Sequence, residues 1–151
     1  MKRILVALDE SPASAHAAEF VNEFFDRDRY EILALNVAGT PVPWVDAGIG
    51  YAGVYPYAYS GPYGLGTDTD VITEVEVERG EEALQASGVV SDEKLVEFGE
   101  PVSAISAVAV EHNVDLIVVG SHENGFFKRI LAGSVSEGLV RRAPRPVLVV
   151  H

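Results

Sequence analysis

The chain has 151 residues, 48% of them hydrophobic and 23% charged, which is typical of a single globular domain with one core. Its 23 acidic and 11 basic residues give a formal charge of −12, and this charge disfavours binding to nucleic acid or to an anionic membrane. There are no cysteines, so the sequence excludes disulfides, thiolate nucleophiles and cysteine-ligated metal centres.

The first two elements are predicted as a strand followed by a helix. The apolar run at 3–8 is bounded by charge, as in a strand that is covered on both faces. Ser11 before Pro12 is typical of a helix N-cap and first turn. The residues expected on the inward face of this helix are Ala17, Phe20, Val21 and Phe24.

The same signals predict the remaining elements. The further strands are expected at 30–37, 94–98, 115–119 and 146–150. Helices are expected at 70–86, from Pro101 onward and at 135–142. The residues expected to face inward from the first two of these helices are Val71, Val75, Ala83, Ile105 and Val108. The strand at 94–98 alternates polar and apolar residues, which is typical of a strand with one solvent-facing side or of a strand at a sheet edge.

Strand and helix therefore alternate through five cycles, which predicts an α/β fold with a parallel sheet and helices on both of its faces. The segment 38–67 interrupts this alternation, because it is rich in Gly, Pro and Tyr and has no clear periodicity. A loop of this length is typical of a lid, a binding loop or a disordered insertion. Its aromatic residues are suited to packing over the sheet or to contacting a ligand or partner.

The loops after the first and fourth strands are where a ligand site is expected, because open parallel sheets bind ligands beyond the carboxyl ends of their strands. The first of these loops offers Asp9, Glu10 and Ser11. The second runs over 120–134 and leads directly into the last helix.

An anion site is one interpretation of this second loop. A helix N-terminus presents unpaired N–H groups, and a glycine lets a phosphate approach the backbone closely. Gly133 and Ser134 stand at that position, and Lys128 and Arg129 add local positive charge. The alternative is that Ser134 and Glu137 form a capping box and close their own helix.

Four segments together resemble the universal stress protein family. They are LVALDESP at 5–12, VVGSH at 118–122, LAGSV at 131–135 and RAPRPVLVV at 142–150. The resemblance implies a five-stranded parallel sheet in the order 3-2-1-4-5, which places the first and fourth strands side by side. It also implies a role in the stress response, as a sensor or regulator.

The nucleotide-binding branch of that family carries the motif G-x-x-G-x9-G-S/T and binds ATP, with Mg²⁺ as a possible companion, and turns it over little. Gly120, Gly133 and Ser134 match this motif, whereas Glu123 stands in place of its second glycine and Gly125 follows two positions later. This departure favours the alternative of a member that binds no nucleotide and acts through its dimer and loop surfaces.

The resemblance assigns seven residues to a nucleotide site. Asp9 would lie near base and ribose, the main chain of Val37 would meet adenine, and the N–H of Val135 would meet phosphate. The full set is Asp9, Val37, Gly120, His122, Gly133, Ser134 and Val135. Each also has a structural interpretation, as a turn acid, a strand end, a loop residue or a helix start.

Catalytic and metal-binding patterns are not evident. The chain has no G-x-S-x-G elbow and no G-x-x-x-x-G-K loop, and His16, His112 and His151 are not spaced with carboxylates as metal ligands. Hydrolysis has no evident nucleophile or base. We therefore expect a binding protein rather than an enzyme, with slow ATP hydrolysis as the remaining alternative.

The last strand predicts self-association. Val147 to Val150 are apolar on both faces, and the implied strand order leaves this strand at an edge, where it needs a covering partner. We expect a homodimer formed through it.

The short apolar run at the start is no signal-peptide core and no stretch is long enough to span a membrane, so we expect a cytoplasmic protein. The acidic, lysine-poor composition is halophile-like.

Overall fold

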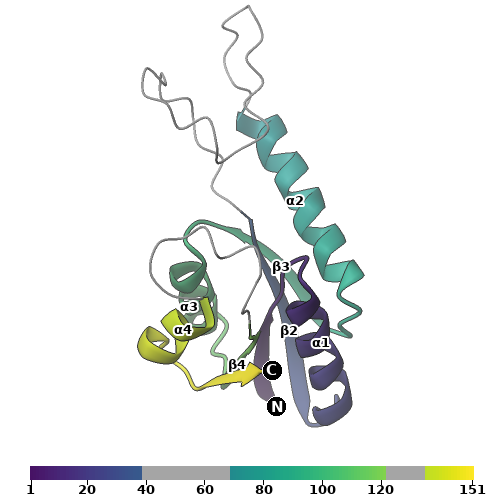
Figure 1. Cartoon of the computed structure of the whole chain (residues 1–151), viewed down its shortest axis with the longest axis vertical. Coiled ribbons are helices and arrows are strands. Elements are labelled where there is room, and N and C mark those ends of the chain that lie inside the picture. Colours follow the sequence, from purple (N-terminus) through teal and green to yellow (C-terminus); the bar gives the residue numbers. More distant parts are fainter. Residues whose placement is uncertain (39–68, 122–134) are drawn as a thin grey trace, which may run out of the picture.

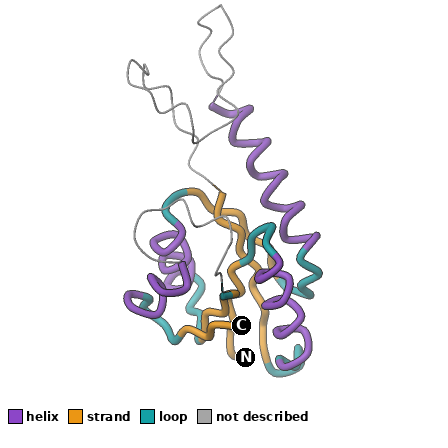
Figure 2. The backbone as a smooth tube through the Cα atoms, viewed as in Figure 1, coloured by secondary structure: helices purple, strands orange, loops and turns teal. Residues whose placement is uncertain are grey.

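The computed structural model describes residues 1–38, 69–121 and 135–151. Within them, five parallel strands form one sheet in the order β3-β2-β1-β4-β5, which confirms the predicted fold class and strand order. The strands are β1 (Lys2–Ala7), β2 (Tyr30–Ala38), β3 (Glu93–Phe98), β4 (Leu116–Gly120) and β5 (Val147–Val150). The sheet lies between the helices, as Figures 1 and 2 show.

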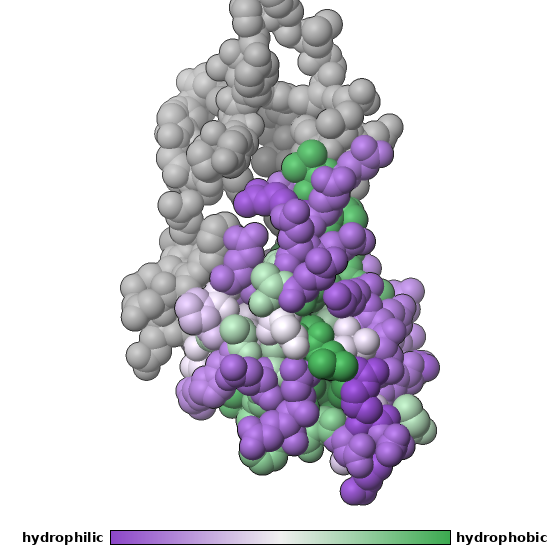
Figure 3. Space-filling model, turned by 90° about the vertical axis from the view of Figure 1, so that its right-hand side faces the viewer, coloured by the Kyte–Doolittle hydropathy of each residue, from purple (hydrophilic) through white to green (hydrophobic). Residues whose placement is uncertain are grey.

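Two pairs of helices cover the two faces of the sheet. The helices are α1 (Pro12–Phe24), α2 (Thr69–Ala86), α3 (Pro101–Glu111) and α4 (Val135–Arg142). The pair α1 and α2 covers one face, and the pair α3 and α4 covers the other (Figure 1). On the side of the molecule that carries α1 and α2, the outer surface is largely hydrophilic (Figure 3).

The sheet is buried on both faces, as the continuous apolar strands predict. Along β1, Ile4 and Val6 pack toward α1, whereas Leu5 packs toward α3. All three side chains are almost completely buried. Because successive strand residues point to opposite faces, an unbroken apolar run is what a centrally placed parallel strand requires.

Local signals at the start of α1 were interpreted correctly. Ser11 is the N-cap and its hydroxyl accepts a hydrogen bond from the Ser14 N–H at 3.2 Å, while Pro12 occupies the first turn. An N-cap oxygen stabilises a helix by satisfying one of its unpaired N–H groups. The helix then buries Ala17 and Val21 against the sheet, as predicted.

Two predicted core residues are exposed instead. Phe24 is 62% exposed and stacks on Phe20, with ring centroids 4.5 Å apart. Val75 in α2 is 49% exposed, whereas Ala83, nearer the carboxyl end of α2, is buried. The amino half of α2, to which Val75 belongs, extends past the sheet in Figure 1.

The element boundaries differ from the prediction by at most one residue. β1 ends at Ala7 rather than at residue 8, and β2 includes Ala38, which the prediction had placed at the start of the loop. The rest of that loop lies outside the described residues. In the part of the chain that the structure covers, no helix combines the length and apolar character needed to cross a membrane.

Candidate functional site

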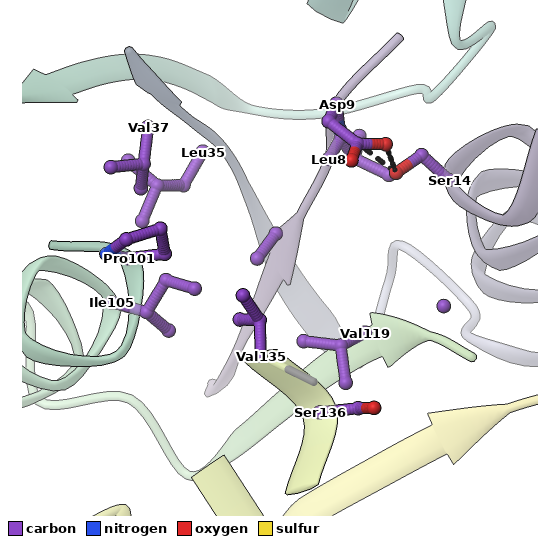
Figure 4. Close-up of a pocket in the computed structure, with 12 residues that line it drawn as sticks. Leu8, Asp9, Ser14, Leu35, Val37, Pro101, Ile105, Val119, Val135 and Ser136 are labelled. Carbon is purple, nitrogen blue, oxygen red and sulfur yellow. Dashed lines mark hydrogen bonds between the residues drawn. The ribbon is translucent and has the colours of Figure 1, made fainter. Parts of the chain in front are cut away.

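A pocket lies where the carboxyl ends of β1, β2 and β4 meet the first turns of α3 and α4 (Figure 4). It contains about 490 Å³ of space, part of it open to solvent. Its lining residues are Ala7, Leu8, Asp9, Ser14, Leu35, Val37, Pro101, Ile105, Val119, Gly120, Val135 and Ser136.

Asp9 follows β1 and is held firmly in place. Its Oδ1 accepts hydrogen bonds from the Ser11 N–H at 3.0 Å, from the Ser11 hydroxyl and from the Ser14 hydroxyl at 2.6 Å. The Asp9 N–H in turn donates to Ser14 Oγ at 2.8 Å. Among the pocket-lining residues described, Asp9 is the only ionisable one.

Gly120 ends β4 beside the first turn of α1. A Cβ added to Gly120 would lie 2.4 Å from the carbonyl oxygen of Ala13. Real Cβ atoms do not approach a backbone oxygen so closely, so the packing of α1 against β4 requires glycine here. This steric role is sufficient to explain the glycine whether or not a phosphate binds nearby.

One wall of the pocket is apolar and comes from β2 and α3. Leu35 and Val37 project from the end of β2, and Pro101 and Ile105 face them from α3 (Figure 4). Leu35 and Ile105 are almost completely buried. A flat, apolar ring system is the kind of ligand that such a wall accommodates.

The start of α4 also lines the pocket. Val135 and Ser136 line the space, and the helix continues to Arg142. Glu137 stands in its first turn, and Arg141 and Arg142 stand in its last turn. Arg141 Nη2 lies 3.4 Å from Glu137 Oε1, so one of the two arginines pairs along its own helix.

The N-cap of α3 carries a charge beside the pocket. Both oxygens of Glu100 accept backbone hydrogen bonds, from the N–H of Val102 at 3.1 Å and of Ser103 at 2.8 Å. Partial burial raises the pKa of this carboxyl, but the hydrogen bonds from Ser103 and Val102 and the charge of Arg142 outweigh burial and lower the pKa overall. The carboxylate is therefore kept ionised as a cap of α3.

Comparison with known proteins decides the family. The family model described as the universal stress protein family matches residues 1–151. The chain belongs to this family. The family membership inferred from the four sequence segments is thereby confirmed.

Individual relatives of the universal stress protein family match over parts of the sequence. Universal stress protein MJ0577 of Methanocaldococcus jannaschii is 39% identical over 56 residues, which are 37% of this chain and 35% of the relative. The chain spans less than half of the length of the first curated relatives that it matches.

Solved structures of the family share the fold over nearly the whole chain. A universal stress protein in complex with cAMP has a TM-score of 0.58 at 20% identity, covering 99% of this chain and 96% of the other. A family protein from Arabidopsis thaliana with AMP bound has a TM-score of 0.60 at 20% identity, covering 99% and 91%.

The structure brings together four of the seven residues that the family resemblance assigned to the site of this universal stress protein. Asp9, Val37, Gly120 and Val135 all line the pocket, and they come from four different elements or their ends. His122, Gly133 and Ser134 lie outside the described residues, as does Glu123.

Several pocket residues were not predicted. No motif marks Ser14, Leu35 or Pro101 as part of a site, although Pro101 is predicted as the start of a helix. Ser14 stands in the helical turn after the Ser11 cap, where a serine is an ordinary residue. The available signal was its place in the first turn of the helix, five residues after Asp9.

Within the described residues, no group of three or more His, Asp or Glu side chains is arranged to hold a metal ion.

Proposed function

We propose that this universal stress protein binds an adenine nucleotide, ATP with Mg²⁺, in the pocket at the ends of β1 and β4. In this proposal it acts as a sensor or regulator of the stress response and turns the nucleotide over slowly or not at all. The observation that carries the proposal is the convergence of Asp9, Val37, Gly120 and Val135 on one pocket. The pocket thus offers an acceptor, an apolar wall and a helix start together.

Each part of a nucleotide has a suitable counterpart in the pocket. The apolar wall of Leu35, Pro101 and Ile105 suits the base. The start of α4, with its N–H groups and partial positive charge, suits the phosphates. Asp9 would repel phosphate but accept hydrogen bonds from hydroxyl groups, so it suits the ribose.

The backbone of Val37 supports the same orientation. The last strand pair between β1 and β2 is Ala7 with Leu35, and the Leu8 N–H donates to the Leu35 carbonyl at 2.8 Å. Backbone groups of alternate residues point to the same side of a strand. The peptide groups of Val37 are therefore directed past the end of β1, where a base edge can pair with them.

Relatives with bound nucleotides also support the proposal. The solved structures with cAMP and with AMP share this fold, although their low identity to this chain carries no residue roles. The family therefore includes members that hold adenine nucleotides on the same scaffold.

Release of bound ligand tests the proposal. The purified protein is denatured, the supernatant is separated by chromatography, and isothermal titration with ATP·Mg follows on the nucleotide-free protein. We expect adenine nucleotide in the supernatant or binding heat with one site per chain. Absence of both at millimolar ATP would favour a member that acts through dimer and loop surfaces instead.

We also propose that two copies associate through β5. This strand is one edge of the sheet, and its residues Val147–Val150 carry no charge. The opposite edge, β3, carries Glu93, Lys94 and Glu97 among its residues. Charged side chains protect an edge from pairing, whereas an uncharged edge invites it, so β5 is the edge suited to a second copy.

A further inference from the structure

The hydroxyl of Ser14 forms a closed ring of hydrogen bonds with Asp9. It accepts from the Asp9 N–H at 2.8 Å and donates to Asp9 Oδ1 at 2.6 Å. Figure 4 shows the two side chains turned toward each other at the pocket. Ser14 is 4% exposed, so water does not compete effectively for this hydroxyl.

The ring, together with the hydrogen bonds from the Ser11 N–H and hydroxyl to the same Oδ1, fixes the orientation of the Asp9 side chain. Backbone and side chain of Asp9 both bind the same oxygen atom, which is itself fixed on the first turn of α1. The rotamer of the carboxylate is thus set by α1 and not by a ligand. A preoriented acceptor loses less conformational entropy on binding than one that must be ordered by its ligand.

We propose that Ser14 is a positioning residue for ligand recognition: it holds the Asp9 carboxylate so that Asp9 selects ligands carrying ribose hydroxyl groups. The inference rests on the proposed function, because it requires a nucleotide in the pocket. The inference adds to the proposed function a role for Ser14: through Asp9, and without touching the ligand, Ser14 lets the site distinguish ribose from deoxyribose.

The test compares two nucleotides on the full chain. Binding of ATP·Mg and of 2′,3′-dideoxy-ATP·Mg is measured by titration for the wild type and for Ser14→Ala. We expect the wild type to prefer ATP by about tenfold, the effect of one hydrogen bond to a charged group. Ser14→Ala should lose most of this preference by weakening ATP binding, while dideoxy-ATP binding stays within about twofold.

Three controls distinguish a loss of Asp9 positioning from a general effect of the substitution on the structure. Ser106→Ala removes another helical serine, which donates to the Val102 carbonyl at 2.6 Å and does not line the pocket; it should leave both affinities unchanged. Ser14→Cys, assayed under reducing conditions, repeats the test with a weaker hydrogen-bonding group if the alanine variant does not fold. In the Asp9→Asn background, Ser14→Ala should have little further effect, because the two residues act together.

The outcomes separate the inference from the function on which it rests. Equal losses for ATP and dideoxy-ATP in Ser14→Ala would overturn the positioning role, as would a wild type that binds both nucleotides equally. A wild type that binds neither nucleotide would overturn the proposed function and the inference with it. Selective loss of ATP binding supports both.

Discussion

Gly120 shows how one residue can serve packing and site at once. It lines the pocket, and its missing Cβ makes room for the Ala13 carbonyl of α1. We predict that Gly120→Ala lowers the free energy of unfolding by about 1–3 kcal/mol, the usual cost of forced overpacking. Urea denaturation monitored by circular dichroism measures this difference.

Gly138 in α4 is the matched control for that substitution. A Cβ on Gly138 would lie 2.8 Å from Cγ2 of Val102, which belongs to a side chain and can shift, whereas the backbone of Ala13 cannot do so easily. We therefore expect Gly138→Ala to cost less than Gly120→Ala. An equal or larger loss in Gly138→Ala would contradict the steric account of Gly120.

Single residues also mark what the sequence can and cannot predict. Asp9 was predicted because it follows an apolar strand, and strand ends are where ligands bind in open sheets. The prediction that Phe24 is buried was wrong, because helical spacing shows which residues share a face of the helix but not how far the sheet beneath that face extends. In the structure Phe25 packs edge-on against Tyr30, with centroids 5.3 Å apart, and Phe24 is left at the surface.

At the scale of the element, the α3 cap predicts a dependence of stability on pH. The pKa of Glu100 is lowered in the folded chain, so its contribution is complete above the pKa of the unfolded chain and is lost as pH falls through the folded value. We expect Glu100→Ala to cost about 1 kcal/mol near neutral pH, as for other N-caps. The difference from wild type should shrink on acidification.

Urea denaturation of wild type and Glu100→Ala over a series of pH values measures this. Glu97→Ala provides the comparison, since it removes the same charge from an exposed position on β3, outside any helix cap. A wild-type advantage over Glu100→Ala that grows as pH falls would show that the carboxylate does not act as the cap.

Elements were predictable where sequence periodicity and burial agree. Strands β1 and β4 lie in the centre of the sheet and read as unbroken apolar runs, so their type was clear. α2 was harder, because only its carboxyl half packs on the sheet, through Gly80, Ala83 and Leu84. Val75 belongs to the half that extends past the sheet. The local sequence of a helix does not indicate how far the neighbouring strands extend.

For the whole molecule, the proposed association through β5 predicts a specific monomeric variant. The N–H of Ile117 donates to the Pro146 carbonyl, and the N–H of Ser121 donates to the Val150 carbonyl. The backbone groups of even-numbered residues in this strand therefore point toward β4. Val149 therefore directs its N–H to the open edge. Val149→Pro removes an edge donor without breaking a bond to β4, and should give a folded monomer.

Sedimentation velocity at micromolar concentration, with circular dichroism as the check on folding, tests this prediction. The wild type should sediment as a dimer and Val149→Pro as a monomer with a native spectrum. A wild type that remains monomeric, or a variant that remains dimeric, would contradict association through this edge.

The ligand site is formed by residues that only the complete fold brings together, so the sequence predicted some of its residues and not others. The strand order that brings Asp9 beside Gly120 came from family resemblance, because alternation of elements alone leaves several orders open. The apolar wall formed by Val37 and Ile105 joins β2 to α3, and no spacing in the sequence indicates that contact.

The most direct test of the central claim is a nuclear magnetic resonance titration of the nucleotide-free protein with ATP·Mg, following the backbone amide signals. We predict shifts concentrated at Val37, Gly120, Val135 and Ser136, which surround the pocket. Asn113, at the opposite ends of the strands in the turn before β4, should stay unchanged. Saturating ATP·Mg that shifts no pocket amide, or shifts only amides remote from it, would contradict the account.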